Sequence, residues 1–541
     1  MSQTSGSTSV TSGRISEGPS AAINRKRLFT GICFALVPTA FSFVLVSNIL
    51  AQLKLEFILT NAQVGYIGGA ALWGMAISLL LFGPFLEKVG FKKAVVGAFV
   101  GHLAGVTLFL AAYPFAGDPS AFWILFLGAI GFGIGNGMIE VSGNPLTATL
   151  YPDNKTTKLN HFHAFFPGGM VVGGILGWLM VQAGEVGGIN LGHWTTQMAI
   201  CYIPIFVYGA LVLRQEFPET ERAQAGISIQ EMFRYTLTHP LMWLMMLLMM
   251  ITVSLELGPM RWIPEVLQAA GVHGILVFAW ISGLMMLLRM FAGPFVERLS
   301  PPGMLLGASV LTGIGLVMFS SFETGIFALM TAATVFALGV AFYFPTMVGL
   351  VSERLPRTGS LGVILMIGLG MLAGGAAAPF MGGIADRYLP EALPEDQTIA
   401  ILEQIEARFP AYIERAEAAA GDAEALASLG YRAADVQAVW DNAQEALAYY
   451  QAEGELHGRA TANTFRALQD TGLEQEAELA QEAYGLLRPA DNYGGRMAFR
   501  WVAPFAFVIA VIFAIMFIRD QRRGGYQAVR LEKSGAEAGG V

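Results

Sequence analysis

Three polar side chains recur at four-residue intervals inside a long apolar stretch. Asn136, Glu140 and Asn144 lie in "GNGMIEVSGNPL", and residues four apart share one face of a helix. A charge at membrane depth costs roughly 2.5–3.5 kcal/mol on insertion scales, so this face should point at water, a partner or a substrate. A carboxylate can carry a proton, and amides bond hydroxyl groups. The pattern predicts a path for a proton or a polar solute; a cluster that only joins helices is the alternative.

A second group follows in "ITVSLELGPMRWIPEVL". Glu256 lies in an apolar run, and Gly258 and Pro259 predict a break or kink directly after it. Interrupted helices often line transport sites. Arg261 and Trp262 come next, and an aromatic ring beside charged and amide groups suits a sugar, whose C–H faces stack on rings. For Arg261 and Trp262, anchoring at the membrane interface is the alternative.

Arg289 and two histidines complete the candidates. Arg289, in "SGLMMLLRMFAGPF", could extend to the interface or pair with a carboxylate. His161 and His163, two residues apart on a helix, point in different directions, so no metal site is expected; His163 facing the cavity and a polar pair at a helix end both stay open. His102 is interpreted as a structural histidine. No catalytic constellation, cofactor motif or nucleic-acid patch is found, so neither an enzyme nor a nucleic-acid partner is predicted.

The elements that carry these residues are predicted to be membrane-spanning helices. The 541 residues are 54% hydrophobic and only 13% charged, and charge-poor runs of about 20 residues, long enough to cross a bilayer, recur. Such runs are too long for barrel strands, so the fold class is an all-α polytopic membrane protein. Twelve spans are expected, at 28–51, 62–86, 94–114, 121–148, 161–183, 195–214, 240–264, 273–296, 303–321, 325–350, 360–385 and 497–519.

Lysine and arginine predict how the chain is oriented. They concentrate at the chain ends and in every second connection, whereas the other connections are nearly free of them, with Lys54 as the exception. By the positive-inside rule both termini are cytoplasmic, and a multi-pass protein of the plasma (inner) membrane is expected. Residues 1–24 form a predicted disordered tail without the apolar core of a signal peptide, and 520–541 a cytoplasmic tail.

The chain also repeats itself. "GPFLEKVGFKK" begins at Gly83 and "GPFVERLSPPG" at Gly293, each after the second span of a half. "NPLTATL" and "FPTMVGL" each end a fourth span. Two pseudo-symmetric six-helix bundles are therefore predicted, one over 25–214 and one from helices in 240–387 and 495–519, with a cytoplasmic linker at 215–239. The repeated motifs are candidate cytoplasmic gating motifs, with Gly83, Glu87, Lys88, Gly293, Glu297 and Arg298.

One segment breaks this pattern. Residues 388–494, between the last two spans, are rich in Ala, Glu, Gln and Leu, and from Glu391 to Asp491 they hold 20 acidic and 6 basic side chains. The composition predicts an acidic, helical insert, and its place after the eleventh span puts it outside the cytoplasm. A solvated cap is the favoured interpretation; a domain that captures a partner or ligand is the alternative.

Taken together, these motifs resemble the major facilitator superfamily, and within it the fucose/glucose/galactose:H+ symporter branch. "FILTNAQVGYIGGA", "GMIEVSGNPL", "LRMFAGPFVERL" and "GSLGVILMIGLGMLAGGAAAPFMGGIAD" carry the resemblance, which covers both bundles but not the insert. It implies alternating access, with Glu140 on the proton or substrate path and Glu256 similar to the helix-7 glutamate of hexose carriers. Fucose members have an aspartate in helix 1; the comparable stretch here is Val46–Ala51, with Asn48.

The sequence thus predicts a monomeric secondary transporter for a small polar solute. A monosaccharide is the favoured substrate, and proton coupling is left open. An uncoupled facilitator, or a membrane receptor that senses through the acidic insert, remains as an alternative. No cofactor or metal is expected.

Overall fold

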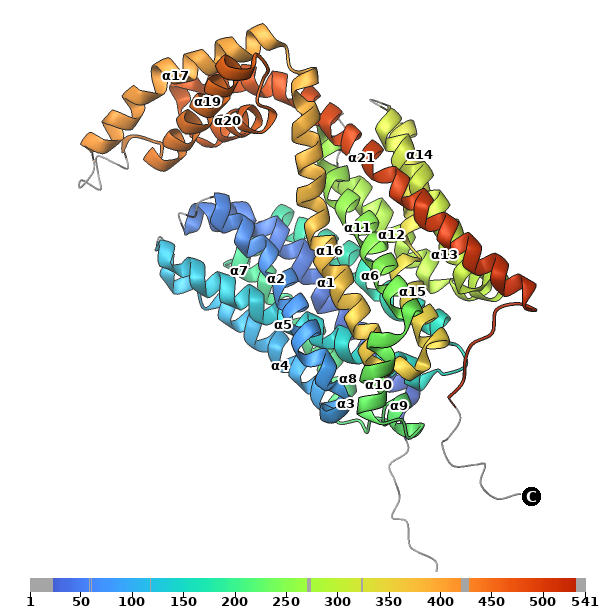
Figure 1. Cartoon of the computed structure of the whole chain (residues 1–541). Helices are drawn as coiled ribbons and strands as arrows, with labels where there is room; N and C mark the ends of the chain where they lie inside the picture. The colour runs from blue at the N-terminus through green and yellow to red at the C-terminus, as the bar shows by residue number, and fades with distance from the viewer. Residues whose placement is uncertain are drawn as a thin grey trace, which may run out of the picture.

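The computed structural model describes residues 23–57, 59, 61–116, 118–269, 274–322, 325–419 and 428–531. Nearly all of them are helical, because a chain this apolar satisfies its backbone polar groups inside helices. The helices form two bundles side by side and a third group above them (Figure 1). We call residues 25–214 the N half, and residues 240–388 together with 495–522 the C half.

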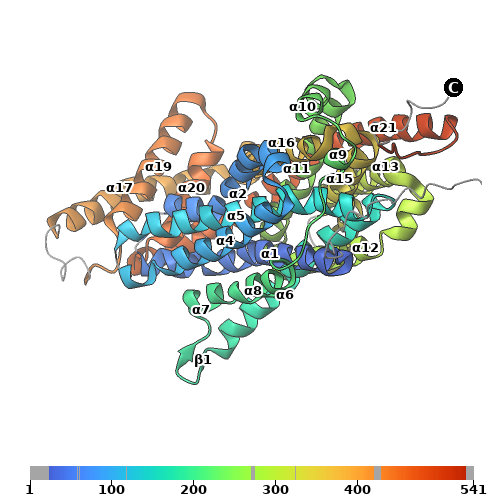
Figure 2. The same ribbon diagram turned by 90° about the horizontal axis from the view of Figure 1, so that it is seen from below.

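The N half consists of long helices joined by short connections. Its elements are α1 (Arg25–Glu56), α2 (Asn61–Phe82), η1 (Gly83–Phe85), α3 (Leu86–Val89), α4 (Phe91–Leu110), η2 (Tyr113–Phe115), η3 (Pro119–Ala121), α5 (Phe122–Leu150), α6 (Lys155–Ala183), β1 (Glu185–Val186), β2 (Ile189–Asn190), α7 (Trp194–Ala199) and α8 (Tyr202–Val212). The β1–β2 hairpin turns at Gly187 and Gly188, which both have positive φ, and it projects from the bundle (Figure 2).

The linker and the C half follow. The linker contains α9 (Glu221–Gln224) and α10 (Ile229–Thr238), and the C half contains α11 (Pro240–Ala269), α12 (Gly274–Met290), α13 (Gly293–Ser321), α14 (Ile326–Val340), α15 (Tyr343–Arg354), η4 (Pro356–Thr358), α16 (Gly359–Tyr388) and the end of α21 (Ala477–Arg522). Gly258 and Pro259 do not interrupt α11, which is one helix throughout. The expected break is therefore wrong, and the kink that was its alternative stays a prediction.

The packing of the two halves repeats. In the N half α1 packs on α6 and α8, and α5 packs on α2 and α4. In the C half α11 packs on α16 and α21, and α14 packs on α12 and α13. The same neighbours meet in the same chain order, which is what an internal duplication of a six-helix unit requires.

Within the described residues, eleven helices are long and apolar enough to cross a membrane. The eighth expected span, 273–296, corresponds to α12, whose apolar part is the shorter helix Val277–Met290. The tenth span consists of α14 and α15 together, and the last is the end of a helix that begins far earlier than position 497. The expected total of twelve spans stays a prediction.

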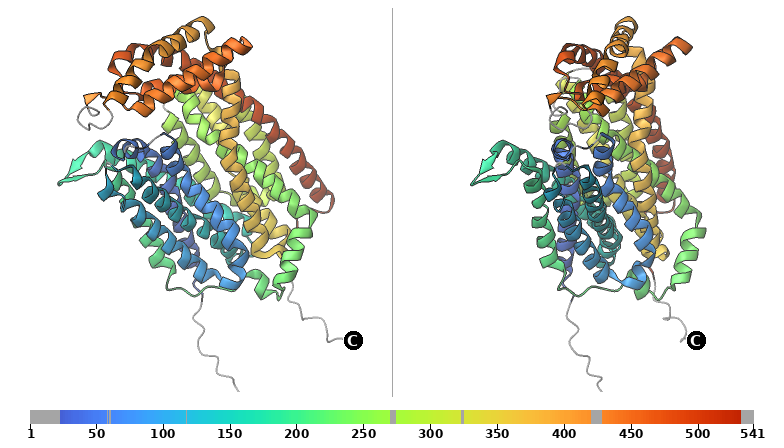
Figure 3. Two further views of the ribbon diagram at one scale, coloured as in Figure 1. Left: turned by 60° about the vertical axis from the view of Figure 1, so that its left-hand side comes forward. Right: turned by 90° about the vertical axis from the view of Figure 1, so that its left-hand side faces the viewer.

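The halves meet along α6, which packs on α12 and α15, and along α16, which packs on α2 and α5. Small residues allow the helices to approach: a Cβ on Gly83 would lie 2.2 Å from Ile364, and one on Gly349 2.3 Å from Thr156. α1 begins and α21 ends at the same end of the bundles (Figure 3). We call this the termini end and the opposite one the cap end.

The cap consists of the described residues of 389–494. Its elements are η5 (Leu389–Ala392), α17 (Glu395–Ala418), α19 (Ala433–Glu453), α20 (Gly458–Asp470), η6 (Glu474–Glu476) and the beginning of α21. They pack around a hydrophobic core of their own, with Ile405, Phe409 and Phe465 fully buried. The cap overhangs the N half (Figure 1). Because α21 runs unbroken for 46 residues through position 494, the expected boundary of the insert falls inside a helix.

Candidate functional site

A chain of hydrogen bonds begins at Glu140 on α5. Its Oε2 accepts a hydrogen bond from Asn144 Nδ2 at 2.6 Å, and Asn144 Oδ1 lies 2.8 Å from His163 Nε2 on α6. Because an amide oxygen only accepts, Nε2 of His163 carries the hydrogen. All three side chains are buried. The four-residue spacing of Glu140 and Asn144 thus allows the direct contact between their side chains.

Arg289 continues this chain into the other half. On α12, its Nη1 donates to the backbone oxygen of His163 at 3.2 Å, and its Nη2 donates to Glu256 Oε1 on α11 at 3.1 Å. Its Nε donates to the Ala341 carbonyl at 2.6 Å, where α14 gives way to α15. Arg289 is only 2% exposed. One guanidinium therefore connects α6 of the N half with three helices of the C half.

We call Glu140, Asn144, His163, Arg289 and Glu256 the central network. It holds two buried carboxylates and one buried guanidinium, and a buried charge without a partner is costly. Glu256 has Arg289 as its ion-pair partner. Glu140, among the described residues, has no cation within ion-pair distance and relies on Asn144. Protonation of Glu140 would therefore remove a buried charge and leave the Arg289–Glu256 pair in place.

Asn136 lies outside the central network. Its Oδ1 is 2.9 Å from His102 Nε2 on α4, and its Nδ2 donates to Ser42 on α1 at 3.3 Å. His102 Nδ1 is in turn 2.9 Å from Tyr208, so both of its ring nitrogens are bonded inside the N half. The expected common face fails here because each four-residue step on a helix turns by about 40° beyond a full turn, which separates Asn136 from Asn144 by about 80°.

Three other candidates lie elsewhere. Asn48 packs inside the N half, with its Nδ2 2.6 Å from where a Cβ of Gly177 would be. Trp262 lies near Gly382 of α16, beside a cavity under the cap. The side chain of Arg261 lies outside the described residues. The central network therefore gathers neither Asn48 nor Trp262, and the expected aromatic wall next to Glu256 is not found there.

At the termini end, Glu87 holds the halves together. It accepts from Ser360 of α16 at 2.7 Å, from Thr220 of the linker at 2.5 Å and from Arg222 at 3.0 Å. Its side chain is only 1% exposed. Lys88 beside it is exposed. Of the first repeated motif, Glu87 and Gly83 therefore contact the C half directly.

The second repeated motif, which begins at Gly293, does not make the contacts that the first motif makes. Glu297 and Arg298 are exposed, and Gly293 comes near Thr157 only at an ordinary packing distance of 3.6 Å. The contact equivalent to that of Glu87 is made by Glu353, which accepts from Thr156 N at 3.1 Å and from Thr156 Oγ1 at 2.7 Å. The sequence reasoning missed Glu353, although it stands three residues after the repeated "FPTMVGL".

The segment after α21 reinforces this closure. Tyr526 donates to Glu353 Oε2 at 2.6 Å, and Arg530 pairs with Asp153 of the N half at 2.7 Å. Burial and the adjacent Glu353 carboxylate raise the pKa of Tyr526 above its ordinary value, so the phenol keeps its proton and remains a donor. Lys155 adds a further bond, to Glu221 of the linker at 2.7 Å. Bonds between the halves therefore close the termini end.

At the cap end the halves are joined through the cap. Lys54 of α1 pairs with Asp470 of α20 at 3.3 Å, and Arg432 donates to the Leu59 carbonyl at 3.2 Å. Lys54 was the exception to the charge pattern of the connections. Its partner in the cap accounts for a cation at this position.

Comparison with known proteins shows which family this helix arrangement belongs to. The family model described as Major Facilitator Superfamily matches residues 31–379. The chain belongs to this superfamily. Its members are membrane transporters and not enzymes, as the sequence motifs predicted, and the chain is a multi-pass membrane protein. The match covers α1 to most of α16, and leaves out the cap and α21.

Individual superfamily relatives are distant. The gentisate transporter of Corynebacterium glutamicum is 26% identical over 253 residues, 44% of this chain and 53% of that protein; the chain thus spans about half the length of this relative. The L-fucose-proton symporter of Escherichia coli is 22% identical over 389 residues, 66% of this chain and 87% of that protein.

Solved structures agree on the superfamily fold. FucP in the outward conformation matches with a TM-score of 0.55 and 17% identity, over 66% of this chain and 92% of that one. The proton:xylose symporter XylE bound to 6-bromo-6-deoxy-D-glucose also matches with a TM-score of 0.55, at 16% identity, over 66% of this chain and 89% of that one. At these identities the likeness establishes the fold alone.

Proposed function

We propose that this protein is a proton-coupled secondary transporter for a small polar solute, with a monosaccharide as the favoured substrate. The observation that carries the proposal is the central network, in which Arg289 bonds both the His163 carbonyl and Glu256. A charged group of one half that bonds the other half is placed to respond when the halves move. Buried ionisable residues in membrane helices commonly mark ion and substrate paths.

In the proposed cycle, the halves rock about the central network. The termini end is closed by Glu87 with Ser360 and by Glu353 with Thr156, and the cycle requires both bonds to break. A proton on Glu140 removes its charge before that step. In this proposed cycle the solute crosses in the same rocking step, so that proton and solute move together.

The orientation follows from charge. Arginine and lysine concentrate at the termini end, with Arg25, Lys26 and Arg27 in the first turn of α1 and Arg519, Arg522 and Arg523 after the membrane part of α21. This distribution supports cytoplasmic termini, a cytoplasmic linker and an extracytoplasmic cap. The closed termini end is then the cytoplasmic gate.

The relatives support a small solute as the substrate, but their own named substrates differ. A fucose-proton symporter is among them, and the solved structure of a xylose symporter holds a hexose analogue. A gentisate transporter and a putative niacin/nicotinamide transporter of Bacillus subtilis favour an aromatic acid as the second candidate. The resemblance puts an acid near Asn48 in fucose carriers. Because this chain has an amide there, Glu140 is the remaining proton carrier, and an uncoupled facilitator is the alternative.

The test is uptake into proteoliposomes by the purified full-length protein. A panel of radiolabelled sugars, with gentisate and nicotinate as a second arm, is assayed with and without an imposed inward proton gradient. The proposal predicts that at least one sugar accumulates above equilibrium only with the gradient. Equilibration without accumulation would indicate a facilitator, accumulation of the aromatic acids alone would change the substrate class, and no flux of any solute would favour a receptor.

A further inference from the structure

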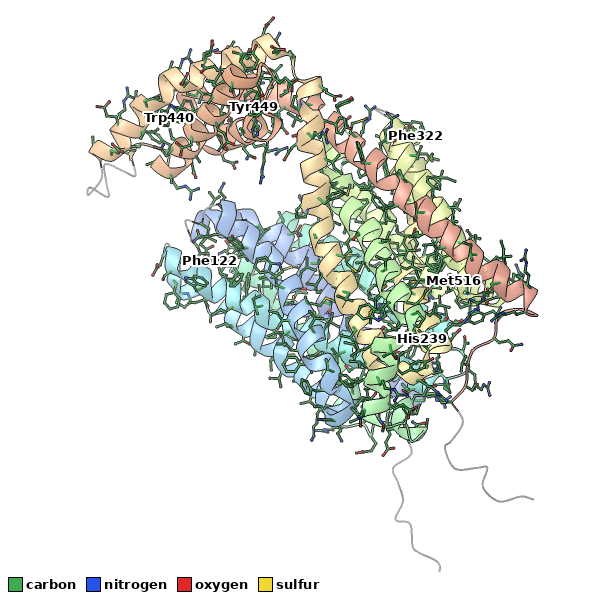
Figure 4. The ribbon with its side chains drawn as sticks, in the orientation of Figure 1. Phe122, His239, Phe322, Trp440, Tyr449 and Met516 are labelled. Carbon is green, nitrogen blue, oxygen red and sulfur yellow. The ribbon has the colours of Figure 1, made fainter. Side chains whose placement is uncertain are left out.

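A cavity of ≈ 1170 Å³ lies between the cap and the C half, apart from the central network. Its upper wall is the lower face of the cap, and its lower wall is the cap end of α11 and α16. Tyr449, which contributes to the upper wall, lies in the cap (Figure 4). The family match does not include the cap, so the shared fold does not account for this cavity.

The walls are held firmly together. The beginning of α20 rests on α16: a Cβ on Gly458 would come within 2.0 Å of the Asp386 carbonyl. α21 also touches α16, since a Cβ on Gly494 would be 2.6 Å from the Ala385 carbonyl. Only glycine permits backbones to approach so closely. The cap and the C half are therefore packed directly against each other beside the cavity.

One face of α20 provides the hydrogen-bond donors. Arg459, Asn463 and Arg466 all line the cavity, and their spacing of four and three residues puts them on one helix face. The cap is strongly acidic, with 6 basic side chains against 20 acidic ones between Glu391 and Asp491. Two of those 6 occupy this face. Arg459 has, within the described part of the chain, no ion-pair or hydrogen-bond partner.

Other residues of both walls provide acceptors and aromatic rings. Asp386, Glu391, Glu395 and Glu455 line the cavity together with Trp262 and Tyr449. Against these carboxylates stand Arg387, Arg459 and Arg466. An anion would meet four carboxylates and a cation would meet three guanidinium groups, so the mixed lining favours a neutral ligand. Groups that donate and accept in pairs suit adjacent hydroxyls, and aromatic faces suit C–H surfaces.

We propose that the cap cavity is a second saccharide-binding site, which captures neutral sugars at the entrance of the transporter. This rests on the proposed function for its ligand class and extends it to the cap. The cavity exceeds the 300–1,000 Å³ of ordinary small-molecule pockets, so it has room for a disaccharide as well as a monosaccharide. Arg459 and Asn463 bond hydroxyl oxygens, and Asp386 accepts from hydroxyl hydrogens.

The experiment is calorimetric titration of the full-length protein in lipid nanodiscs with D-galactose, maltose, D-glucuronate and D-glucosamine. Arg459→Gln removes the unpaired guanidinium of the cavity. Arg415→Gln is the matched control, because Arg415 is an exposed cap arginine that lies over the Tyr412 ring and not in the cavity. Thermal melting of both variants verifies that the fold is retained.

The inference predicts that galactose or maltose binds, that Arg459→Gln weakens this binding by about tenfold and that Arg415→Gln does not. Binding of glucuronate or glucosamine alone, equal binding by both variants, or no saccharide binding would overturn it. Glu140→Gln, titrated in parallel, should keep the cap site. Cap binding without any sugar flux would contradict the proposed function and leave this inference standing. Sugar flux without Arg459-dependent binding would support the proposed function and overturn this inference.

Discussion

Arg289 is a side chain that bonds both halves of the molecule. It is buried, and it divides its donors among Glu256, a backbone carbonyl of α6 and one between α14 and α15. The planar guanidinium has five N–H donors in a rigid fork, which lets one side chain serve these three acceptors at once. At the residue scale, the charge balance of the central network is therefore set by one cation on the C half.

Removing this cation should lower the stability of the folded protein and not merely its transport rate. Arg289→Gln leaves Glu256 buried without its partner, and breaking a buried pair from one side costs about 3–5 kcal/mol. Thermal melting in detergent should show a clear loss of stability. The double variant Arg289→Gln/Glu256→Gln should recover most of it, because no unpaired charge remains. A double variant as unstable as the single one would contradict the pairing.

Asn136 and Asn144 offer a matched comparison on one helix. Asn136→Ala removes bonds to His102 and Ser42 inside the N half, so we expect a stability loss of about 1–3 kcal/mol with flux per folded molecule retained. Asn144→Ala removes the bond to Glu140 and should abolish most of the flux. Uptake normalised to folded protein measures both. Equal flux losses would mean that Asn136 is on the path after all.

The sequence identified five members of the central network, because an acid, an amide or a guanidinium in an apolar run is conspicuous by type alone. It could not say which of them meet. The contact of Glu256 with Arg289 depends on how α11 packs on α12, and no spacing encodes that. Asn136 was misplaced because a four-residue repeat drifts around a helix, and Trp262 because its ring is directed to the cap cavity.

At the scale of elements, the apolar runs predicted the helices well and their ends poorly. α21 extends some twenty residues before the expected span, because its cap portion is amphipathic and so lacks a strong membrane signal. Gly258 and Pro259 predicted a break in α11, yet the helix continues, with Gly258 close to Ala377 of α16. Tertiary packing thus overrides a local signal for helix interruption.

The connection after α2 is the element that should control the closure at the termini end. Glu87→Ala removes three hydrogen bonds, to Ser360, Thr220 and Arg222, and should shift the population toward the state with an open termini end. The readout is labelling of Ala148→Cys, at the cleft between the halves, by a membrane-impermeant thiol reagent in inside-out vesicles. Cys33 and Cys201 are buried and give little background.

The expected result is faster labelling in Glu87→Ala than in the parent. Lys88→Gln is the control, since Lys88 is exposed and adjacent, and its labelling rate should not change. If Glu87→Ala and the parent were labelled at the same rate, the bonds of Glu87 would not hold the gate.

At the scale of the whole molecule, the cap continues from helices of the C half and touches the N half through Lys54 and Arg432. The composition of 388–494 predicted a helical insert, but it could not predict that the insert is anchored on helices of the C half and bonded to the N half by Lys54–Asp470 and Arg432–Leu59. That anchoring follows from α16 and α21, which extend from the C half to the cap. Rocking of the halves must then move the cap across the N half.

Fixing the cap to the N half should therefore arrest transport. In Lys54→Cys/Asp470→Cys, a short bis-methanethiosulfonate reagent links the two positions, and we expect sugar uptake to stop and to recover when a reductant releases the link. Arg408→Cys/Glu476→Cys, which replaces an ion pair within the cap, is the control and should transport after treatment. Full uptake by the linked first pair would rule out relative motion of cap and N half.

The central claim is that Glu140 couples a proton to movement of the two halves, and one measurement tests it most directly. Proteoliposomes with the parent protein or Glu140→Gln are compared for uptake driven by a proton gradient and for exchange of labelled against unlabelled sugar. The account predicts that Glu140→Gln loses gradient-driven accumulation and keeps exchange, because the amide imitates the protonated acid. Accumulation that is unchanged by the substitution would contradict it.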